Sequence, residues 1–239
     1  VYRDIELKLV SVLAGMEQQG IKIDKGYFAE YGRELGSKIA KLEKEVFFLA
    51  GREFNLNSPK QLSDILFIDM EISTVGVKKT KTGISTDTEV LELLASRGEK
   101  IADKILDYRK YAKLKSTYLD ALPKLTDSKS RIHTTFNQNG TATGRLSSSN
   151  PNLQNIPAKT EDGMLIRGGF IAEEGYSLVA FDYSQIELRV LAEISGDKEL
   201  VKAYEDGLDL HTLTAMKIFE KENKSDITRE ERTIAKVVN

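Results

Sequence analysis

Asp182 is the residue whose type and position most directly suggest chemistry. It follows the short apolar run Ser177–Phe181, which has the composition of a buried strand, and a segment with helical spacing follows it. In α/β proteins, ligand and metal groups commonly lie at the carboxyl ends of strands. A carboxylate there suits Mg²⁺, a hard ion that prefers oxygen ligands and shares its shell with substrate phosphates. The alternative is that Asp182 only closes the strand and caps a turn.

A pair of cations lies near the end of the chain. Arg232 and Lys236 are four residues apart on a predicted helix, so their side chains project from one face. A guanidinium beside an ammonium group forms a suitable clamp for a triphosphate. The same spacing is common on ordinary solvated helix faces, so the pair alone leaves both interpretations open.

Two further regions have residue types that suit nucleic acid. The segment Gly140–Pro157 carries Arg145, Gln154 and three Asn residues, and amide and guanidinium groups commonly read base edges. A generic polar surface loop would have the same composition. Between Arg97 and Lys115, seven basic and three acidic residues give a net charge of +4 in nineteen residues. This patch fits either phosphate contacts or a solvated helix face.

The overall composition narrows the class of protein. The 239 residues are 40% hydrophobic and 30% charged, which is typical of a globular protein with one or two domains. With no cysteine, the chain has no disulfides, no thiolate zinc site and no cysteine nucleophile. No apolar run approaches the roughly 18 residues needed to cross a bilayer, and charges interrupt the start of the chain where a signal peptide would be apolar. A cytoplasmic protein without a membrane partner is therefore expected.

Apolar spacing predicts helices over the first half of the chain. One covers 5–19 and a second covers 24–49. The sequences SPKQ at 58–61 and TDTE at 86–89 are typical helix starts, with Ser58 and Thr86 as the expected caps. The helix that follows the second start is expected to continue to about Leu122.

Beyond residue 126 the chain changes character, because Ser, Thr, Asn and Gly dominate up to residue 157. The final predicted helix is still running at Asn239, which suggests that the sequence is incomplete. The other expected elements are a strand over 131–137, a buried strand over 177–182, a helix over 184–196 capped by Ser184, helices over 198–206 and 210–221, and the final helix from Thr228.

Residues 182–189, DYSQIELR, resemble the first palm motif of the family A DNA polymerases, the bacterial DNA polymerase I type. The resemblance runs in the same order over nearly the whole chain. The other similar segments are 54–58 and 114–118 for the thumb, 143–148 and 151–157 for template–primer binding, and Arg232, Ala235, Lys236 and Asn239 for the fingers helix.

The resemblance implies an α+β, mostly helical right-hand polymerase fold in truncated form. The expected parts are a helix leading into the palm (1–23), a helical thumb (24–126), a partial antiparallel-sheet palm (127–196) and the start of the fingers (197–239). The implied activity of the complete protein is template-directed DNA synthesis, in which a nucleotide passes from a dNTP to a primer 3′-hydroxyl. The implied partners are primer–template DNA and dNTPs, and the protein is expected to be a monomer in the bacterial nucleoid.

The same resemblance implies roles for the residues at the chemical centre. Asp182 and the backbone carbonyl of Tyr183 would bind Mg²⁺, of which two ions act in the complete enzyme. Glu187 is similar to the family's sugar gate, which crowds a ribose 2′-hydroxyl, although as the third residue after Ser184 it could also serve the helix cap. His211 could likewise be a packed helix residue. The implied dNTP contacts are Gln185, Glu187, His211, Arg232 and Lys236.

Contacts to DNA follow from the resemblance in three regions. Arg145, Asn152 and Gln154 would touch the minor groove, whose degenerate pattern allows pair geometry to be checked without a choice of sequence. Arg189 would support the primer end or the duplex. The thumb residues expected to hold duplex phosphates are Arg109, Lys110, Lys113 and Lys115.

The chain departs from the family's pattern in one respect that matters for activity. The family's second catalytic carboxylate is absent, so this chain alone is predicted to bind DNA and dNTP without polymerising. Two alternatives remain, a non-catalytic primer–template binding module and a fragment of a single-subunit RNA polymerase. Glu187 and the intact run 182–189 argue against the RNA polymerase.

Overall fold

A computed structural model describes residues 1–80, 83–207 and 209–238, which divide into two compact units. The first unit is Val1–Leu178 and the second is Val179–Asn239. None of the helices within the described ranges combines the length and the apolar composition needed to cross a membrane.

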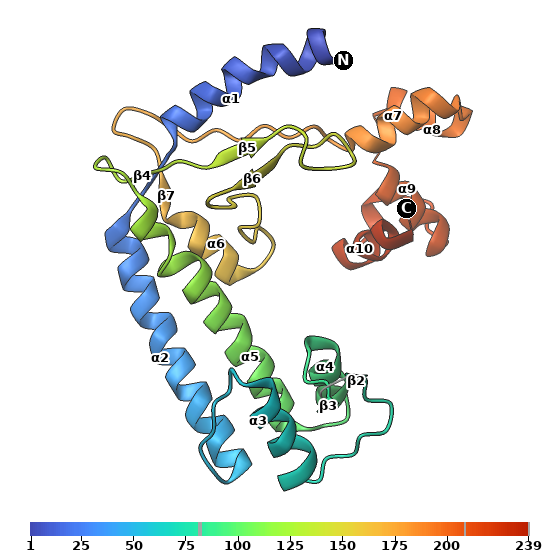
Figure 1. Ribbon diagram of the computed structural model, residues 1–239. Helices are drawn as coiled ribbons and strands as arrows, with labels where there is room; N and C mark the ends of the chain where they lie inside the picture. Colours follow the sequence, from blue (N-terminus) through green and yellow to red (C-terminus); the bar gives the residue numbers. More distant parts are fainter. Residues whose placement is uncertain (81–82, 208, 239) are drawn as a thin grey trace. The chain divides into compact units, whose positions relative to one another are not determined.

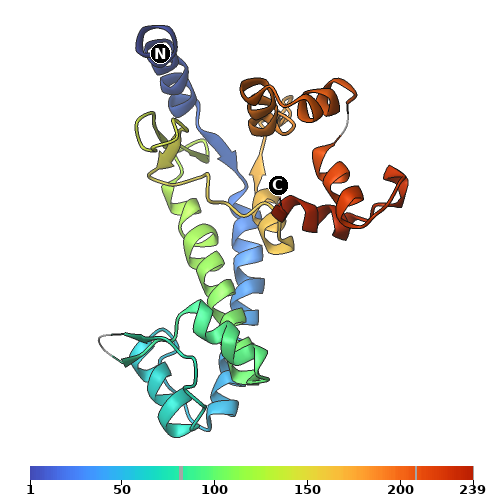
Figure 2. The same cartoon turned by 90° about the vertical axis from the view of Figure 1, so that its right-hand side faces the viewer.

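Two long helices form the centre of the first unit. α2 (Lys25–Ala50) and α5 (Lys100–Leu114) lie side by side in both Figure 1 and Figure 2. Their facing apolar stripes supply the core, in which Phe28, Leu35 and Ile105 are at most 2% exposed. The helix predicted over 24–49 is therefore confirmed, and packing against α5 is what stabilises it.

Two helices of the first unit begin at or next to the residues that the capping signals predicted. Ser58 caps α3 (Pro59–Asp64) as predicted. The cap of α4 (Thr88–Ser96) is Asp87 rather than Thr86, so that prediction was wrong by one residue. The physical reason is that a carboxylate is a stronger acceptor for the first amide of a helix than a neutral hydroxyl.

The expected continuous helix up to Leu122 is also wrong. α4 and α5 are separate helices, because Gly98 between them adopts φ +90°, a left-handed conformation that no helix can pass through. After α5 the chain continues as a π-helical turn over Lys115–Leu119 and a 3₁₀ turn over Leu122–Leu125.

The strands of the first unit are short and antiparallel. The strand predicted over 131–137 forms as two strands that belong to different sheets. Within the described residues, one sheet has three strands, in the order β4 (Arg131–Ile132), β1 (Ile21–Ile23) and β7 (Phe170–Ile171). Two further sheets are pairs: β5 (Thr135–Asn137) with β6 (Ser147–Ser149), and β2 (Lys79–Thr80) with β3 (Gly83–Ile84).

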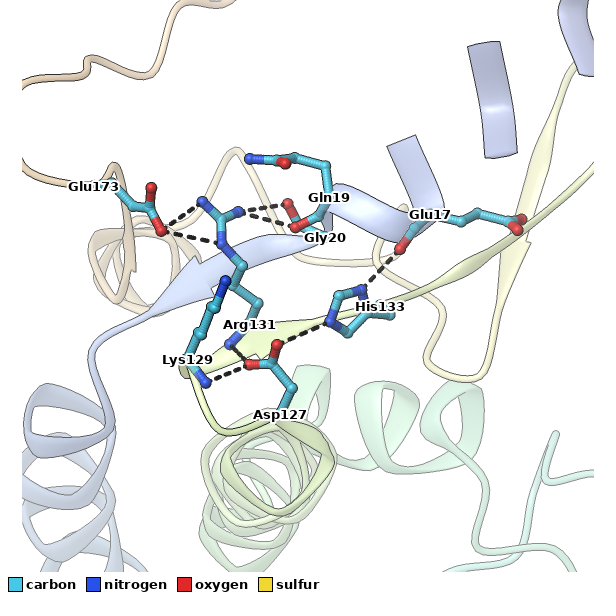
Figure 3. A network of polar contacts seen from close by, with 8 residues as sticks. All are labelled: Glu17, Gln19, Gly20, Asp127, Lys129, Arg131, His133 and Glu173. Carbon is cyan, nitrogen blue, oxygen red and sulfur yellow. Dashed lines mark hydrogen bonds and ion pairs between the residues drawn. The ribbon is translucent and has the colours of Figure 1, made fainter. Parts of the chain in front are cut away.

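A polar network fixes the end of α1 (Leu7–Gln19) to the three-stranded sheet (Figure 3). Arg131 donates to the carbonyl oxygens of Gln19 and Gly20, at 3.0 Å in each case, and its guanidinium pairs with Glu173 at 3.0 Å. These carbonyls lie where the helix ends, so Arg131 satisfies backbone groups that the helix itself leaves without partners.

His133 supports the same junction from the other side (Figure 3). Its Nδ1 atom lies 2.7 Å from the carbonyl oxygen of Glu17, and its Nε2 atom lies 3.4 Å from the carboxylate of Asp127. The side chains of Arg131 and His133, held by Glu173 and Asp127, therefore determine how the end of α1 meets the sheet.

The second unit is built from helices alone within its described residues. The capping box at Thr228 is confirmed: Glu231 N donates to Thr228 Oγ1 at 3.2 Å, and Thr228 N donates to Glu231 Oε2 at 2.9 Å. The helices are α7 (Ile186–Ser195), α8 (Lys198–Glu205), α9 (Leu210–Ile218) and α10 (Arg229–Val238), with a 3₁₀ turn over Lys224–Asp226.

Two predictions fail at the start of this unit. The segment 177–182 is not a strand and is not buried; Phe181, for example, is 94% exposed. A strand needs a hydrogen-bonded neighbour, and none of the described strands pairs with this segment. Ser184 does not cap the next helix either, because Gln185 occupies the N-cap of α7 with φ +53° and makes no side-chain cap bond.

Candidate functional site

Asp209, which directly precedes α9, is the centre of a polar network in the second unit. Its Oδ2 atom accepts a hydrogen bond from Arg232 Nε at 2.6 Å and another from Thr212 Oγ1 at 2.6 Å. Its Oδ1 atom accepts a short hydrogen bond from Gln185 Nε2. One carboxylate thus connects residues from the start of α7, the first turn of α9 and the first turn of α10.

The network extends from Gln185 to α7 and α8. Tyr204 donates its hydroxyl to Gln185 Oε1 at 3.2 Å, and the guanidinium of Arg189 lies 4.5 Å from the centre of the Tyr204 ring. Arg189 also donates through Nε to the carbonyl of Ser184 at 2.9 Å. The unusual backbone of Gln185 is explained by this arrangement, since its side chain is held by Asp209 and Tyr204 together.

Asp209 remains ionised because of its donors. Burial raises its pKa, but the hydrogen bonds from Arg232, Thr212 and Gln185 outweigh burial and hold the pKa well below its usual range. The side chains of Asp209 and Arg232 are 31% and 39% exposed, so the pair is accessible from solvent while partly shielded from it.

His211 lies in the first turn of α9, two residues after Asp209. The pKa of His211 is lowered, first by burial and then by the positive charges of Arg232 and Lys236, while Asp209 acts in the opposite direction. The described contacts connect three of the predicted residues, Gln185, Arg189 and Arg232. Lys236 is exposed one turn further along α10.

The described hydrogen bonds of this network do not include Asp182 or Tyr183. Asp182 and Tyr183 are exposed on the extended segment before α7, and Glu187 is exposed in its first turn. Because Ser184 is not the cap, the alternative role of Glu187 in a Ser184 capping box is not formed. Among the described residues, no group of three or more His, Cys, Asp or Glu side chains could enclose a metal ion.

The predicted minor-groove residues lie in the first unit, on a loop ordered by one buried hydroxyl. Ser148, 4% exposed, donates to Asn152 Oδ1 at 3.1 Å and accepts from the amides of Leu153 and Gln154 at 3.1 and 3.3 Å. Gln154 Nε2 donates to the carbonyl of Leu146 at 3.2 Å. Arg145, Asn152 and Gln154 are all exposed.

The basic residues of α5 and the turn after it do not form a single face. Arg109 is half-buried and donates to the carbonyl of Thr86. Lys110 pairs with Asp162 of α6 (Glu161–Gly168) at 2.6 Å. Lys115 pairs with Asp120 at 2.7 Å. Lys113, the last of the predicted set, is exposed.

Asp209 is the residue at the centre of this network, and it was not among the predicted site residues. The available signal was an Asp directly before a predicted helix, a position that ordinarily indicates a cap. The structure shows no side-chain cap bond there, and the carboxylate instead binds partners 24 and 23 residues away. Asn239, which was matched to the fingers helix, lies outside the described residues.

Comparisons with a family model and with known proteins all relate this chain to DNA polymerases. The family model described as DNA polymerase family A matches residues 25–239. The DNA polymerase I of Caldicellulosiruptor bescii is 49% identical over 240 residues, covering 100% of this chain and 28% of that protein. The thermostable DNA polymerase I of Thermus aquaticus is 52% identical over 221 residues, covering 92% of this chain and 26% of that protein. The chain therefore spans only about a quarter of the length of these relatives.

A solved polymerase structure has a fold similar to that of this chain. It contains the POL domain of Pol1 from M. smegmatis in complex with DNA primer-template and dNTP. It is 40% identical, covers 98% of this chain and 41% of its own chain, and superposes with a TM-score of 0.86. The fold is therefore that of a polymerase domain, mostly helical with small antiparallel sheets, and the chain belongs to DNA polymerase family A.

Proposed function

We propose that the protein to which this chain corresponds carries out template-directed DNA synthesis, and that the second unit of this chain binds the triphosphate of the incoming dNTP. The observation that carries the proposal is the guanidinium of Arg232, held beside Asp209, with the exposed Lys236 one turn further along α10. A guanidinium and an ammonium group one helical turn apart suit a polyanion. Membership of DNA polymerase family A supplies the reaction class.

The proposed layout follows the right-hand arrangement. Residues 1–23 lead into the palm, 24–126 form the thumb, 127–196 form part of the palm and 197–239 begin the fingers. The long antiparallel pair α2 and α5 supports the thumb assignment, because it makes a stiff arm with its own core.

The residues around Asp182 fit a magnesium ion in donor type. Its exposed carboxylate and the backbone carbonyl of Tyr183 are the hard oxygen donors that Mg²⁺ prefers, and the ion usually completes its shell with phosphate oxygens and water. When bound, such ions activate the primer hydroxyl and stabilise the leaving group. One carboxylate is too few for two ions, which supports the proposal that this chain alone does not polymerise.

The first unit is proposed to hold the DNA. The exposed side chains of Arg145, Asn152 and Gln154 would contact the minor groove, and Lys113 has the exposure that a phosphate contact requires. Lys110, Lys115 and Arg109 would have to exchange their present intramolecular partners to contact DNA. We therefore rank Lys113 first among the thumb cations. The solved relative bound to primer-template and dNTP supports these partners.

The two alternatives are weaker. The matched family and the names of the curated relatives favour DNA over RNA synthesis, and Glu187 in the proposed role of sugar gate would exclude ribonucleotides. A binding module without chemistry would still hold primer–template, so only the nucleotide site separates it from a polymerase.

The decisive experiment is titration of the chain with dTTP and Mg²⁺. Arg232→Ala and Lys236→Ala should each weaken binding by roughly 10- to 100-fold, since a charge-assisted contact contributes roughly 1.5–3 kcal/mol. Lys202→Ala, which removes an exposed cation from α8 of the same unit, is the matched control and should leave binding unchanged. Equal binding by all three variants would contradict the proposed nucleotide site.

A primer-extension assay completes the test. The chain alone should hold a primer–template without lengthening it, and an extended primer would show that the one-carboxylate argument is wrong.

A further inference from the structure

We infer that Asp209 is a positioning residue for the phosphate clamp, holding Arg232 by its Nε atom so that the two terminal amino groups of the guanidinium are presented to the triphosphate. The inference rests on the proposed function, because it assigns a second residue to the same nucleotide site. Nothing in the motifs of the sequence selects Asp209 for this role.

The first support is the side of the guanidinium that Asp209 occupies. The described hydrogen bond uses Arg232 Nε, at 2.6 Å from Asp209 Oδ2. A guanidinium donates five N–H bonds in a fixed planar fork, and four of them belong to the terminal amino groups. A phosphate can therefore bind the terminal pair while Asp209 keeps its hold on Nε.

The second support is that Asp209 is itself anchored. Thr212 Oγ1 donates to the same Oδ2 atom at 2.6 Å, and Gln185 Nε2 donates to Oδ1. Both carboxylate oxygens thus have partners other than Arg232, so the carboxylate is a fixed point and the long Arg232 side chain is oriented by it. Restricting a flexible cation in advance lowers the entropy lost when a ligand binds.

The third support is the connection to the segment that carries Asp182. Gln185 is three residues after Asp182, and its amide is held by the same carboxylate that holds Arg232. Asp209 therefore links the proposed metal-binding segment to the proposed phosphate-binding helix within one unit. A residue in that place can set the distance between the segment that carries Asp182 and the start of α10.

A competing role has an opposite consequence. If Asp209 were an internal substitute for phosphate, the triphosphate would have to displace it from Arg232. Removing the charge of Asp209 would then tighten nucleotide binding, whereas removing a positioning residue weakens it.

The test is a double-mutant cycle on dTTP binding in the presence of Mg²⁺. Asp209→Asn should weaken binding by about tenfold in the otherwise unchanged chain, and by less than about twofold in a chain that already carries Arg232→Ala. Asp206→Asn, which removes an exposed acid three residues away, makes the same change of charge and should have no effect.

Each outcome has a definite meaning. Tighter binding by Asp209→Asn, or equal weakening with and without Arg232, overturns the positioning role while leaving the nucleotide site intact. Failure of the unchanged chain to bind dTTP overturns the proposed function and this inference with it.

A second measurement needs no ligand and guards against simple misfolding. In the unchanged chain, the Arg232 Nε–H signal in a ¹⁵N NMR spectrum should exchange slowly with solvent, because Asp209 accepts from it. Asp209→Asn should accelerate that exchange while the amide signals of α10 keep their positions. Unaltered exchange of the Nε–H would overturn the inference.

Discussion

The two units are stabilised by different means. In the first, large apolar side chains such as Phe28, Leu62 and Ile105 are completely buried. In the second, the buried residues among those described are all alanines, namely Ala192, Ala203, Ala215 and Ala235. Because hydrophobic stabilisation scales with the apolar area removed from water, the first unit has a conventional core and the second does not.

Polar contacts take a larger share in the second unit. Asp209 connects three helices, and Lys221 pairs with Glu231 at 2.7 Å while donating to the carbonyl of Asp226. Such contacts stabilise a fold less than a core does, because each replaces hydrogen bonds to water. The comparison teaches that the unit with the proposed chemistry is held together in part through Arg232, the same group that would bind its ligand.

The largest expected effect is loss of a core side chain in the first unit. Phe28→Ala should lower the free energy of unfolding by about 3–5 kcal/mol, as is usual for a buried phenylalanine. Urea denaturation measures the loss. Phe48→Ala, at a position that is 87% exposed, should change stability little, and a similar loss at both positions would remove the basis of the comparison.

Acid should affect the second unit through Asp209. The pKa of Asp209 in the folded protein lies below its unfolded value of about 3.9. The ionised carboxylate therefore contributes fully to the free energy of unfolding above about pH 3.9, and this contribution is lost as the pH falls toward the pKa of the folded state. NMR signals of Ala215 and Ala235 should report this loss. In Asp209→Asn these signals should depend less on acidic pH, and an unchanged acid response would show that another group controls it.

A smaller effect is expected at the start of α10. Thr228→Ala removes one half of the reciprocal cap with Glu231 and should destabilise the helix by about 1 kcal/mol. Amide exchange in the first turn of α10 measures it. Thr233→Ala, in the exposed middle of the same helix, is the control and should have little effect, because Ala favours helix.

The smallest effect is expected for an exposed ion pair. Lys217 and Glu199 approach to 3.2 Å, but their side chains are 78% and 86% exposed. Solvent screens such pairs, so Lys217→Gln should leave the amide exchange of α9 unchanged. A marked loss of protection would mean that surface charge stabilises the second unit more than its geometry indicates.

Local signals in the sequence predicted the helical part of the fold well. The caps at Ser58 and Thr228 and the long α2 depend on residues within a few positions of one another, and all three are confirmed. Gly98 marks a candidate helix end in the sequence, but its residue type alone does not fix a positive φ, and helical periodicity continues on both sides of it.

Contacts between distant residues could not be predicted in the same way. Residues 177–182 have strand composition, but only a neighbouring strand could make them one, and composition does not supply a neighbour. The hydrogen bonds of Asp209 join residues from three helices, whereas its sequence position indicated only a cap. The cations Arg232 and Lys236 were predicted from spacing and family resemblance, and their roles in binding stay predictions.

The buried hydroxyl of Ser148 has a consequence for how its loop would recognise a partner. One hydroxyl has a single proton and two lone pairs, and the contacts with Asn152, Leu153 and Gln154 use all three. The loop is therefore ordered before any ligand binds. A preordered surface selects partners by how well they already fit it. In the proposed contact with DNA, a distorted duplex would lose contacts with the loop, because the loop would not change its conformation to restore them.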